Sequence, residues 1–338
     1  MLSKLYNILL LLLLIISQNA FSQKHQYLQS FKIADSLGKT ARFNEAQLLF
    51  DSILKHTPSH TDFYFEILNK KAFYYEEAQD NKQAILIVYR VIQESTQPQT
   101  IKTKYLAYLT LALLYEKTDD FKNCKLVLNN ALKLSTTNNL DSLKANYFVR
   151  ISSYYRFVNK PDSAIYFAQK AQDNALIFKN DKELINAHLL LGILFKNNEW
   201  QQAIKHFEIV KNYFLTYTKY DDAAAMYGNI SGIYTMHNNL KLGLLYNDSA
   251  LWVIKNYQIP ASSYIYKQRA SIFEKMNYKD SALVNYKKYT QLFTQEFDLQ
   301  KSTEIKQQNE FGHQSIATEL IAERIKLYNY KRKKNLYS

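Results

Sequence analysis

Small residues recur along this chain at a spacing of about forty residues, and this periodicity restricts the fold more than any other feature of the sequence. Successive members of the series lie 38 to 40 residues apart. They are Ala46, Ala84, Cys124, Ala164, Ala203, Gly243 and Ala282. A regular period of this length is typical of stacked structural repeats. We therefore expect one repeat array, in which each unit packs only on its neighbours.

Other residues recur at fixed offsets from this series. Twelve residues earlier stand Ala34, Ala72, Ala112, Ser152, Leu191, Ser231 and Ala270. Leu191 is the one large member, and a turn shortened by one residue would put Gly192 in its place. Three residues after each member of this second series stand Leu37, Tyr75, Tyr115, Tyr155, Leu194 (Phe195 in the shortened register), Tyr234 and Phe273. Seven residues after each member of the first series stand Ile53, Val91, Ala131, Ala171, Val210, Ala250 and Tyr289. Residues three, four and seven apart share one face of a helix, so each repeat is predicted to contain two helices.

Asn and Asp cluster where the two helices of each hairpin should be joined. These segments are Asp80-Asn81, Asp119-Asp120, Asn159 to Asp162, Asn197-Asn198, Asn238-Asn239 and Asn277 to Asp280. Both residue types favour turns and helix N-caps. Only 6 Gly and 4 Pro occur in 338 residues, too few for a chain rich in strands and tight turns, and the 47% apolar content is sufficient for a continuous core.

The pattern resembles the tetratricopeptide repeat (TPR) family. The first repeat reads Ala34, Phe43, Ala46, Phe50 and Pro58, and the third reads Ala112, Tyr115, Phe121, Cys124, Leu128 and Ala131. The resemblance covers residues 24 to 292, although the period exceeds the family's usual 34 residues by four to six. It implies an all-α, right-handed helical-hairpin solenoid of about seven TPR-like repeats followed by a long C-terminal helix. The expected organisation is a signal peptide (1–22), the solenoid (23–293) and a polar helical stalk or coiled coil with a basic tail (294–338).

The N-terminus has the features of a secretory signal. Lys4 provides a positive charge, Ile8 to Ile16 is an unbroken apolar run, and Ala20-Phe21-Ser22 places small residues at a cleavage site before Gln23. The run is shorter than the ~20 residues that span a bilayer. An uncleaved anchor is the alternative, and a lipid anchor is not expected because no Cys lies near the cleavage site. We expect an exported, periplasmic or secreted protein.

The sequence contains no catalytic constellation, and no metal or cofactor site is expected. His56 and His60 are four residues apart, but Pro58 lies between them. Leu37 to Thr40 is similar to the end of a phosphate-binding loop, yet Ile33 occupies the place of the required upstream Gly, so we interpret this segment as a turn. The single Cys124 replaces the Ala or Gly of other repeats and is interpreted as a small buried apolar residue.

In the TPR family the first helix of each hairpin lines an inner groove. By that register the groove residues would be Asn69, Phe73, Glu76, Asn146, Val149, Arg156, Leu189, Lys196, Tyr264 and Lys267. Their mixed chemistry favours a protein or peptide ligand and differs from the basic, Asn-rich clamp of some family members. Of the 28 Tyr, several lie off the repeat pattern, either as additional core or as a binding face: Tyr64, Tyr74, Tyr108, Tyr147, Tyr154, Tyr227 and Tyr264.

The C-terminal residues are polar and end in a basic tail. Its charges are Arg324, Lys326, Lys331, Arg332, Lys333 and Lys334, nearly half of the net charge of +13. Export argues against nucleic acid as a partner, and contact with anionic lipid head groups stays open.

We predict a non-enzymatic, exported scaffold for protein or peptide interactions. The alternative is the extracytoplasmic sensor region of a truncated or split signal-transduction protein. The chain resembles the exported TPR sensor region of bacterial histidine kinases and helix-turn-helix regulators, and the stretch Tyr328 to Tyr337 resembles the approach to a membrane span. The span and the output domain are absent from the sequence. The ligand, the oligomeric state and the choice between periplasm and extracellular space stay open.

Overall fold

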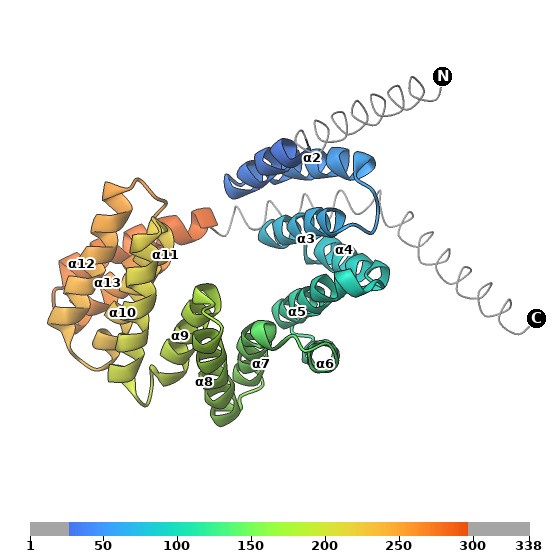
Figure 1. The fold of residues 1–338 in the computed structure, drawn as a ribbon. Helices are drawn as coiled ribbons and strands as arrows, with labels where there is room; N and C mark the ends of the chain where they lie inside the picture. The colour runs from blue at the N-terminus through green and yellow to red at the C-terminus, as the bar shows by residue number, and fades with distance from the viewer. Residues whose placement is uncertain (1–26, 297–338) are drawn as a thin grey trace, which may run out of the picture. The chain divides into compact units, whose positions relative to one another are not determined.

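The computed structural model describes residues 27–296, and every regular element within them is a helix (Figure 1). The predicted signal peptide, the cleavage site before Gln23, nearly all of the predicted stalk and the six basic tail residues lie outside these described residues.

The helices alternate as first and second members of hairpins. The first helices are residues 27–39, α3 (Asp62–Glu77), α5 (Ile101–Lys117), α7 (Lys144–Phe157), α9 (Asp181–Phe195), α11 (Tyr220–Met236) and α13 (Ser263–Lys275). The second helices are α2 (Phe43–His56), α4 (Asn81–Glu94), α6 (Phe121–Thr137), α8 (Pro161–Ile177), α10 (Trp200–Thr216), α12 (Leu240–Asn256) and residues 279–296. Short 3₁₀ turns, η1 (Pro98–Thr100) and η2 (Asp141–Leu143), precede α5 and α7. The predicted all-α helical-hairpin repeat is confirmed.

The contacts divide the chain into two compact units, Met1–Val210 and Lys211–Ser338, with the boundary inside α10. In the first unit α4, α6 and α8 each pack on the first helix of their own hairpin and on the first helix of the next hairpin, as α4 does with α3 and α5. In the second unit α11 packs on α12, and α13 contacts both. This neighbour-to-neighbour packing buries the apolar faces that one hairpin could not bury alone.

The small residues occupy the predicted contact positions. Each member of the main series is the fourth residue of a second helix, and each is fully or almost fully buried. The partner series on the first helices is equally buried. In the exceptional repeat Gly192 lies against the Phe207 ring, where a Cβ atom would come within 3.0 Å of the ring. Leu191 is also buried, at 1% exposed, so the choice between the two registers in this repeat stays a prediction.

The hairpin turns reverse the chain without glycine. Most turns contain one residue with positive φ, such as Gln79 (63°), Asp119 (56°) and Asn238 (59°), and no glycine among the described residues has positive φ. The following residue often caps the next helix: the Asp80 side chain accepts from the Gln83 amide at 3.1 Å, and Asp120 and Asn239 make equivalent bonds. The predicted Asn/Asp turns are confirmed at these positions.

The interpretation of Leu37 to Thr40 as a turn was wrong for most of its length. The first helix continues to residue 39, and the turn begins at Thr40. Gly38 lies inside the helix, where the Tyr74 ring of α3 packs against it and leaves no space for a Cβ atom. The Tyr74 hydroxyl then donates to the Asp35 carboxylate at 2.7 Å, which ties the first helix to α3.

Candidate interaction surface

The first helices form the inner layer of the first unit. Contacts join α3 to α5, α5 to α7 and α7 to α9, whereas α4 and α6, or α6 and α8, make no comparable contact. First helices that touch one another while second helices diverge must lie on the concave side of that unit. This layer is where the family register places a ligand.

The ten predicted groove residues fall into three environments. Glu76 and Val149 are buried, and Asn69, Asn146, Arg156 and Leu189 are half-buried, while Phe73, Lys196, Tyr264 and Lys267 are exposed. Tyr264 and Lys267 belong to the second unit, and the other eight belong to the first. Their role as a single ligand-binding set stays a prediction.

Polar contacts link successive first helices of the first unit across 35 to 41 residues of sequence. The Lys70 ammonium lies 2.7 Å from the Asp35 carboxylate, and Lys117 pairs with the buried carboxylate of Glu76. Further along, the Asn146 amide donates to Glu183 at 2.8 Å. The predicted groove residues Glu76 and Asn146 therefore hold neighbouring repeats together.

A buried carboxylate and two arginines meet between α5 and α7. Glu116 is 4% exposed; its Oε2 accepts from the Ser153 hydroxyl at 3.0 Å, and its Oε1 has no partner among the described residues. Burial raises the pKa of Glu116, while the charges of Arg150 and Arg156 and the Ser153 hydrogen bond act in the opposite direction. A nearly buried carboxylate needs such compensation because desolvation disfavours its charged form.

The two arginines keep unused donors. The Arg150 side chain, half-buried on α7, forms no hydrogen bond or ion pair with any residue between 27 and 296. The Arg156 guanidinium lies 4.1 Å from the centre of the Phe157 ring, and its Nε is buried without a partner in the same range. Guanidinium donors of this kind suit a carboxylate or another planar anion.

The repeat register singles out Arg156 but neither Arg150 nor the buried Glu116. Arg150 lies two residues before Ser152, a position that the small-residue series does not distinguish as inward-facing. Glu116 follows Tyr115 directly, and nothing in the sequence marks it as buried. Both assignments depend on how α5 and α7 pack.

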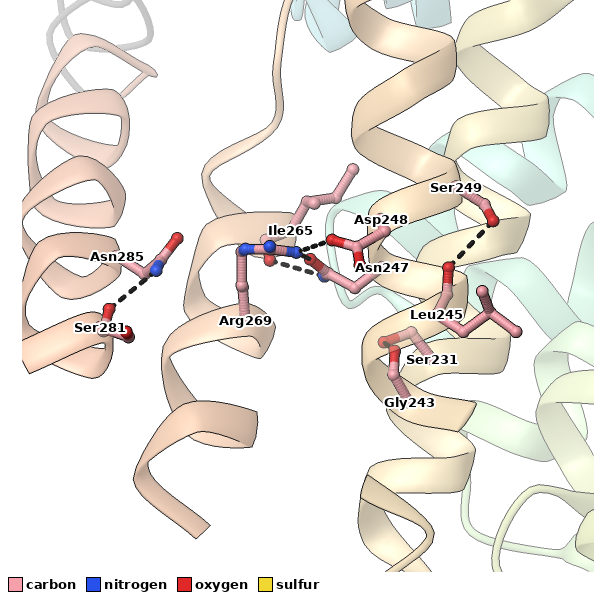
Figure 2. Close-up of polar contacts among 10 residues, drawn as sticks. All are labelled: Ser231, Gly243, Leu245, Asn247, Asp248, Ser249, Ile265, Arg269, Ser281 and Asn285. Atoms are coloured by element: carbon pink, nitrogen blue, oxygen red, sulfur yellow. Dashed lines mark hydrogen bonds and ion pairs between the residues drawn. The ribbon is translucent and has the colours of Figure 1, made fainter. Parts of the chain in front are cut away.

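The second unit contains a separate buried polar contact between α12 and α13 (Figure 2). Asn247, fully buried on α12, donates to the Ile265 carbonyl at 3.0 Å and accepts from Arg269 at 3.2 Å. Arg269 also pairs with Asp248 beside it. Because the donor and the acceptor of the Asn247 side-chain amide are both paired, the burial of this polar residue is explained by the packing of α12 on α13.

No described residues form a group of three or more His, Cys, Asp or Glu side chains that could hold a metal ion. His56 is exposed at the end of α2, and the His60 ring lies 3.4 Å from the Glu94 carbonyl. Two other histidines meet instead: the Nδ1 atoms of His188 and His206 lie 2.8 Å apart between α9 and α10. Nor does any helix within residues 27–296 combine the length and apolar character needed to cross a bilayer.

Cys124 and most of the additional tyrosines are structural. Cys124 is fully buried, as predicted, and burial raises the pKa of its thiol to about 12. Tyr64, Tyr74 and Tyr147 are buried, and Tyr108, Tyr154 and Tyr227 are half-buried, while Tyr264 is 49% exposed. Of the two interpretations of these tyrosines, additional core is right for most, and Tyr264 alone has a largely open surface.

Neither a protein-family model nor a curated protein sequence matches this chain. Solved structures match its fold. The TPR-sensor-containing signal-transduction ATPase from Pyrococcus horikoshii has a TM-score of 0.57 at 16% identity, over 81% of this chain and 44% of that one. A TPR protein from Parabacteroides merdae gives 0.50 at 13%, over 82% and 97%. A Rap protein complexed with Competence and Sporulation Factor gives 0.52 at 11%, over 81% and 99%. The described part of this chain therefore has a tetratricopeptide-like helical-repeat fold.

Proposed function

We propose that this protein is an exported, non-enzymatic scaffold that binds a protein or peptide segment on the inner face of its first unit. The observation that carries the proposal is the unused hydrogen-bonding capacity of Arg150 and Arg156 beside Glu116. The two guanidinium groups are half-buried, so donors that have no internal partner can reach a ligand at this layer.

The charges favour an acidic group on that ligand. Glu116 offsets part of the positive charge of the two arginines, and Lys117 adds a further cation, although Glu76 pairs with it. A carboxylate from an Asp or Glu side chain could accept from the free guanidinium donors. A hydrogen bond to a charged group contributes about 1.5 to 3 kcal/mol. Phe73, 44% exposed on α3, offers an apolar contact on the same helical layer.

The fold supports a peptide-sized partner. The Rap protein that shares it is described as complexed with Competence and Sporulation Factor. An identity of 11% carries no ligand chemistry to this chain, so the acidic preference rests on Arg150 and Arg156 alone. Export rests on Lys4, the run from Ile8 to Ile16 and the small residues before Gln23.

The test compares partner capture by the mature chain and its variants. The paired change Arg150→Gln with Arg156→Gln should abolish capture from a periplasmic extract and abolish competition by acidic peptides. Helicity should stay nearly unchanged, because neither arginine side chain supplies a hydrogen bond to the fold. The melting temperature should fall modestly, because the buried Glu116 loses the two charges that compensate its desolvation, and adding Glu116→Gln should restore it without restoring capture. Phe73→Ala with Arg156→Ala should act in the same direction.

Two control variants test whether the loss of capture is specific to the two inner-face arginines. Arg42→Gln removes an exposed arginine that pairs with Glu45 within one turn, and Cys124→Ala alters a buried packing residue; both variants should keep capture. Capture that survives the arginine changes but is lost on deleting residues 324–338 would reject the inner-face proposal. It would transfer the function to the basic tail and to a membrane surface.

A further inference from the structure

Two imidazole rings meet at the contact between α9 and α10 in the first unit. The Nδ1 atom of His188 lies 2.8 Å from the Nδ1 atom of His206, and the planes of the two rings are tilted by 41°. His188 is 7% exposed and His206 is half-buried. One of the two Nδ1 atoms must accept the hydrogen that the other carries, so at least one of the rings is neutral in the folded hairpin.

The rest of this contact is apolar. The Phe195 ring lies 5.8 Å from the His206 ring, and the Phe207 ring packs against Gly192. Neither imidazole has a second hydrogen-bond partner within residues 27–296. The bond between the two histidines is therefore the polar link of an otherwise apolar contact between helices.

No carboxylate offsets a positive charge at this place. Burial lowers the pKa of His188, and burial followed by the neighbouring His188 lowers the pKa of His206 to about 4. No charge from α7 or α8, the helices packed on α9, contributes to either shift. Glu183 of α9 accepts hydrogen bonds from two asparagines, and Lys205 and Glu208 of α10 do not act on the pair.

We propose that His188 and His206 form an acid-sensitive latch, which holds α10 against α9 while one imidazole is neutral and lets this hairpin open locally when both are protonated. Two imidazolium rings would each present a hydrogen at Nδ1, so their hydrogen bond is lost and two like charges face each other in a partly buried contact. Because the two groups interact directly, they lose and gain protons as a pair.

Acid opens the latch, because both pKa values are lower in the closed hairpin than in an open one. The stabilisation is complete above the ordinary histidine pKa of 6.5 and is lost as the pH falls toward about 4, the value for His206. In a repeat array each hairpin contacts only its neighbours, so one hairpin can open without unfolding the others.

Hydrogen exchange of the folded, mature chain at pH 7 and pH 4.5 measures this opening. After each rate is divided by its intrinsic rate at that pH, amides of α9 and α10 should lose protection on the order of tenfold in acid. Amides of α5 and α6, in the same unit, should change little. At pH 7, nitrogen-15 spectra of the histidine rings should show one Nδ1 protonated and the other bare.

Variants assign the effect to the pair. His206→Phe keeps an aromatic ring and should remove most of the acid-dependent loss, while His188→Leu with His206→Phe should remove it completely. His56→Gln alters an exposed histidine of α2 and should behave as the wild type. If the double variant does not fold, titration of the two wild-type rings decides, since values near 6.5 for both would overturn the latch.

Three other results would overturn the proposal. The first is an acid-dependent loss of equal size in α5, α6, α9 and α10, because it would mean unfolding of the whole unit. The second is a loss at α10 that persists in the double variant, which would assign it to another group. The third is unchanged protection of α9 and α10 at pH 4.5 in the wild type. None of these results bears on partner capture at pH 7.

Discussion

The Ser231 hydroxyl donates a hydrogen bond of 2.7 Å to the backbone carbonyl of Gly243, joining α11 to α12 (Figure 2). Ser152 makes the same bond to Ala164 at 2.8 Å between α7 and α8. In both hairpins the two residues are members of the small-residue series on opposite helices. Small residues let the two backbones approach, and where the first one is Ser its hydroxyl also ties them together.

Gly243→Ala should destabilise the second unit, although most repeats have Ala at this position. The new Cβ would lie 2.6 Å from Thr235 Oγ1 and 3.4 Å from the Ser231 carbonyl oxygen. Overpacking of this kind costs about 1 to 3 kcal/mol. Denaturant unfolding gives the measurement, and adding Thr235→Ala should recover part of the loss. Full stability of the single variant would contradict this packing.

Ala164→Leu and Ala112→Leu should each lower the free energy of unfolding by about 1 to 3 kcal/mol. Both alanines are fully buried where helices cross. Gln169→Leu, on an exposed position of α8, is the matched control and should change stability little. Equal tolerance of the buried and exposed changes would show that the repeat register is wrong.

Thr218→Gly should stabilise the fold by about 1 kcal/mol. Thr218 has φ 55° in the turn after α10, a conformation that is unfavourable for a β-branched residue and free for glycine. The control is Thr216→Gly, inside the last turn of α10, which should destabilise by a similar amount because glycine disfavours helix. Opposite signs in thermal or chemical unfolding are the expected result, and equal signs would contradict it.

Stability should fall as the pH drops from about 6.5 to about 4, because of His206. Burial, followed by the neighbouring His188, lowers the pKa of His206 from 6.5 to about 4. The unfolded chain therefore binds more protons than the folded one in this window, so folding is favoured above it. Allowing for partial solvent exposure, we expect a loss on the order of 1 kcal/mol.

His206→Phe should flatten this pH dependence while keeping an aromatic ring beside Phe195. His56→Gln removes an exposed histidine and should leave the dependence as in the wild type. Denaturant unfolding at pH 4.5 and pH 7 provides the comparison. A wild-type slope retained in His206→Phe would assign the effect to another group.

The mature protein should begin at Gln23. The small residues Ala20 and Ser22 occupy the two positions that a signal peptidase reads, after the apolar run that ends at Ile16. Mass spectrometry of the cell-derived protein measures the terminus directly. An intact Met1 on a cytoplasmic product would reject export, and nucleic acid would then return as a candidate partner for the basic tail.

Local spacing in the sequence was enough to predict the hairpins. Each hairpin packs on its neighbours in the same way. The same features therefore recur from repeat to repeat: the small residues, the aromatic residue one helical turn further on and the Asn/Asp turns. Asp80 and Asn239 could be predicted as caps because their role depends only on the next few residues. The turn was predicted too early because Gly38 was interpreted as a turn residue, whereas it lies in the helix and makes room for the Tyr74 ring of the next repeat.

By itself, the sequence determined the repeat period, the helical class and the close-contact positions, since these follow from residue size and helical periodicity. Only the tertiary structure decided which polar groups meet and which are left without partners. Glu116 meets Ser153 across 37 residues, and Gln268 lies over Gly232 across 36. Such pairs arise from the angle and register between packed helices. The candidate binding residue Arg150 is recognised by the hydrogen bonds that its side chain lacks, and that property exists only once the helices are packed.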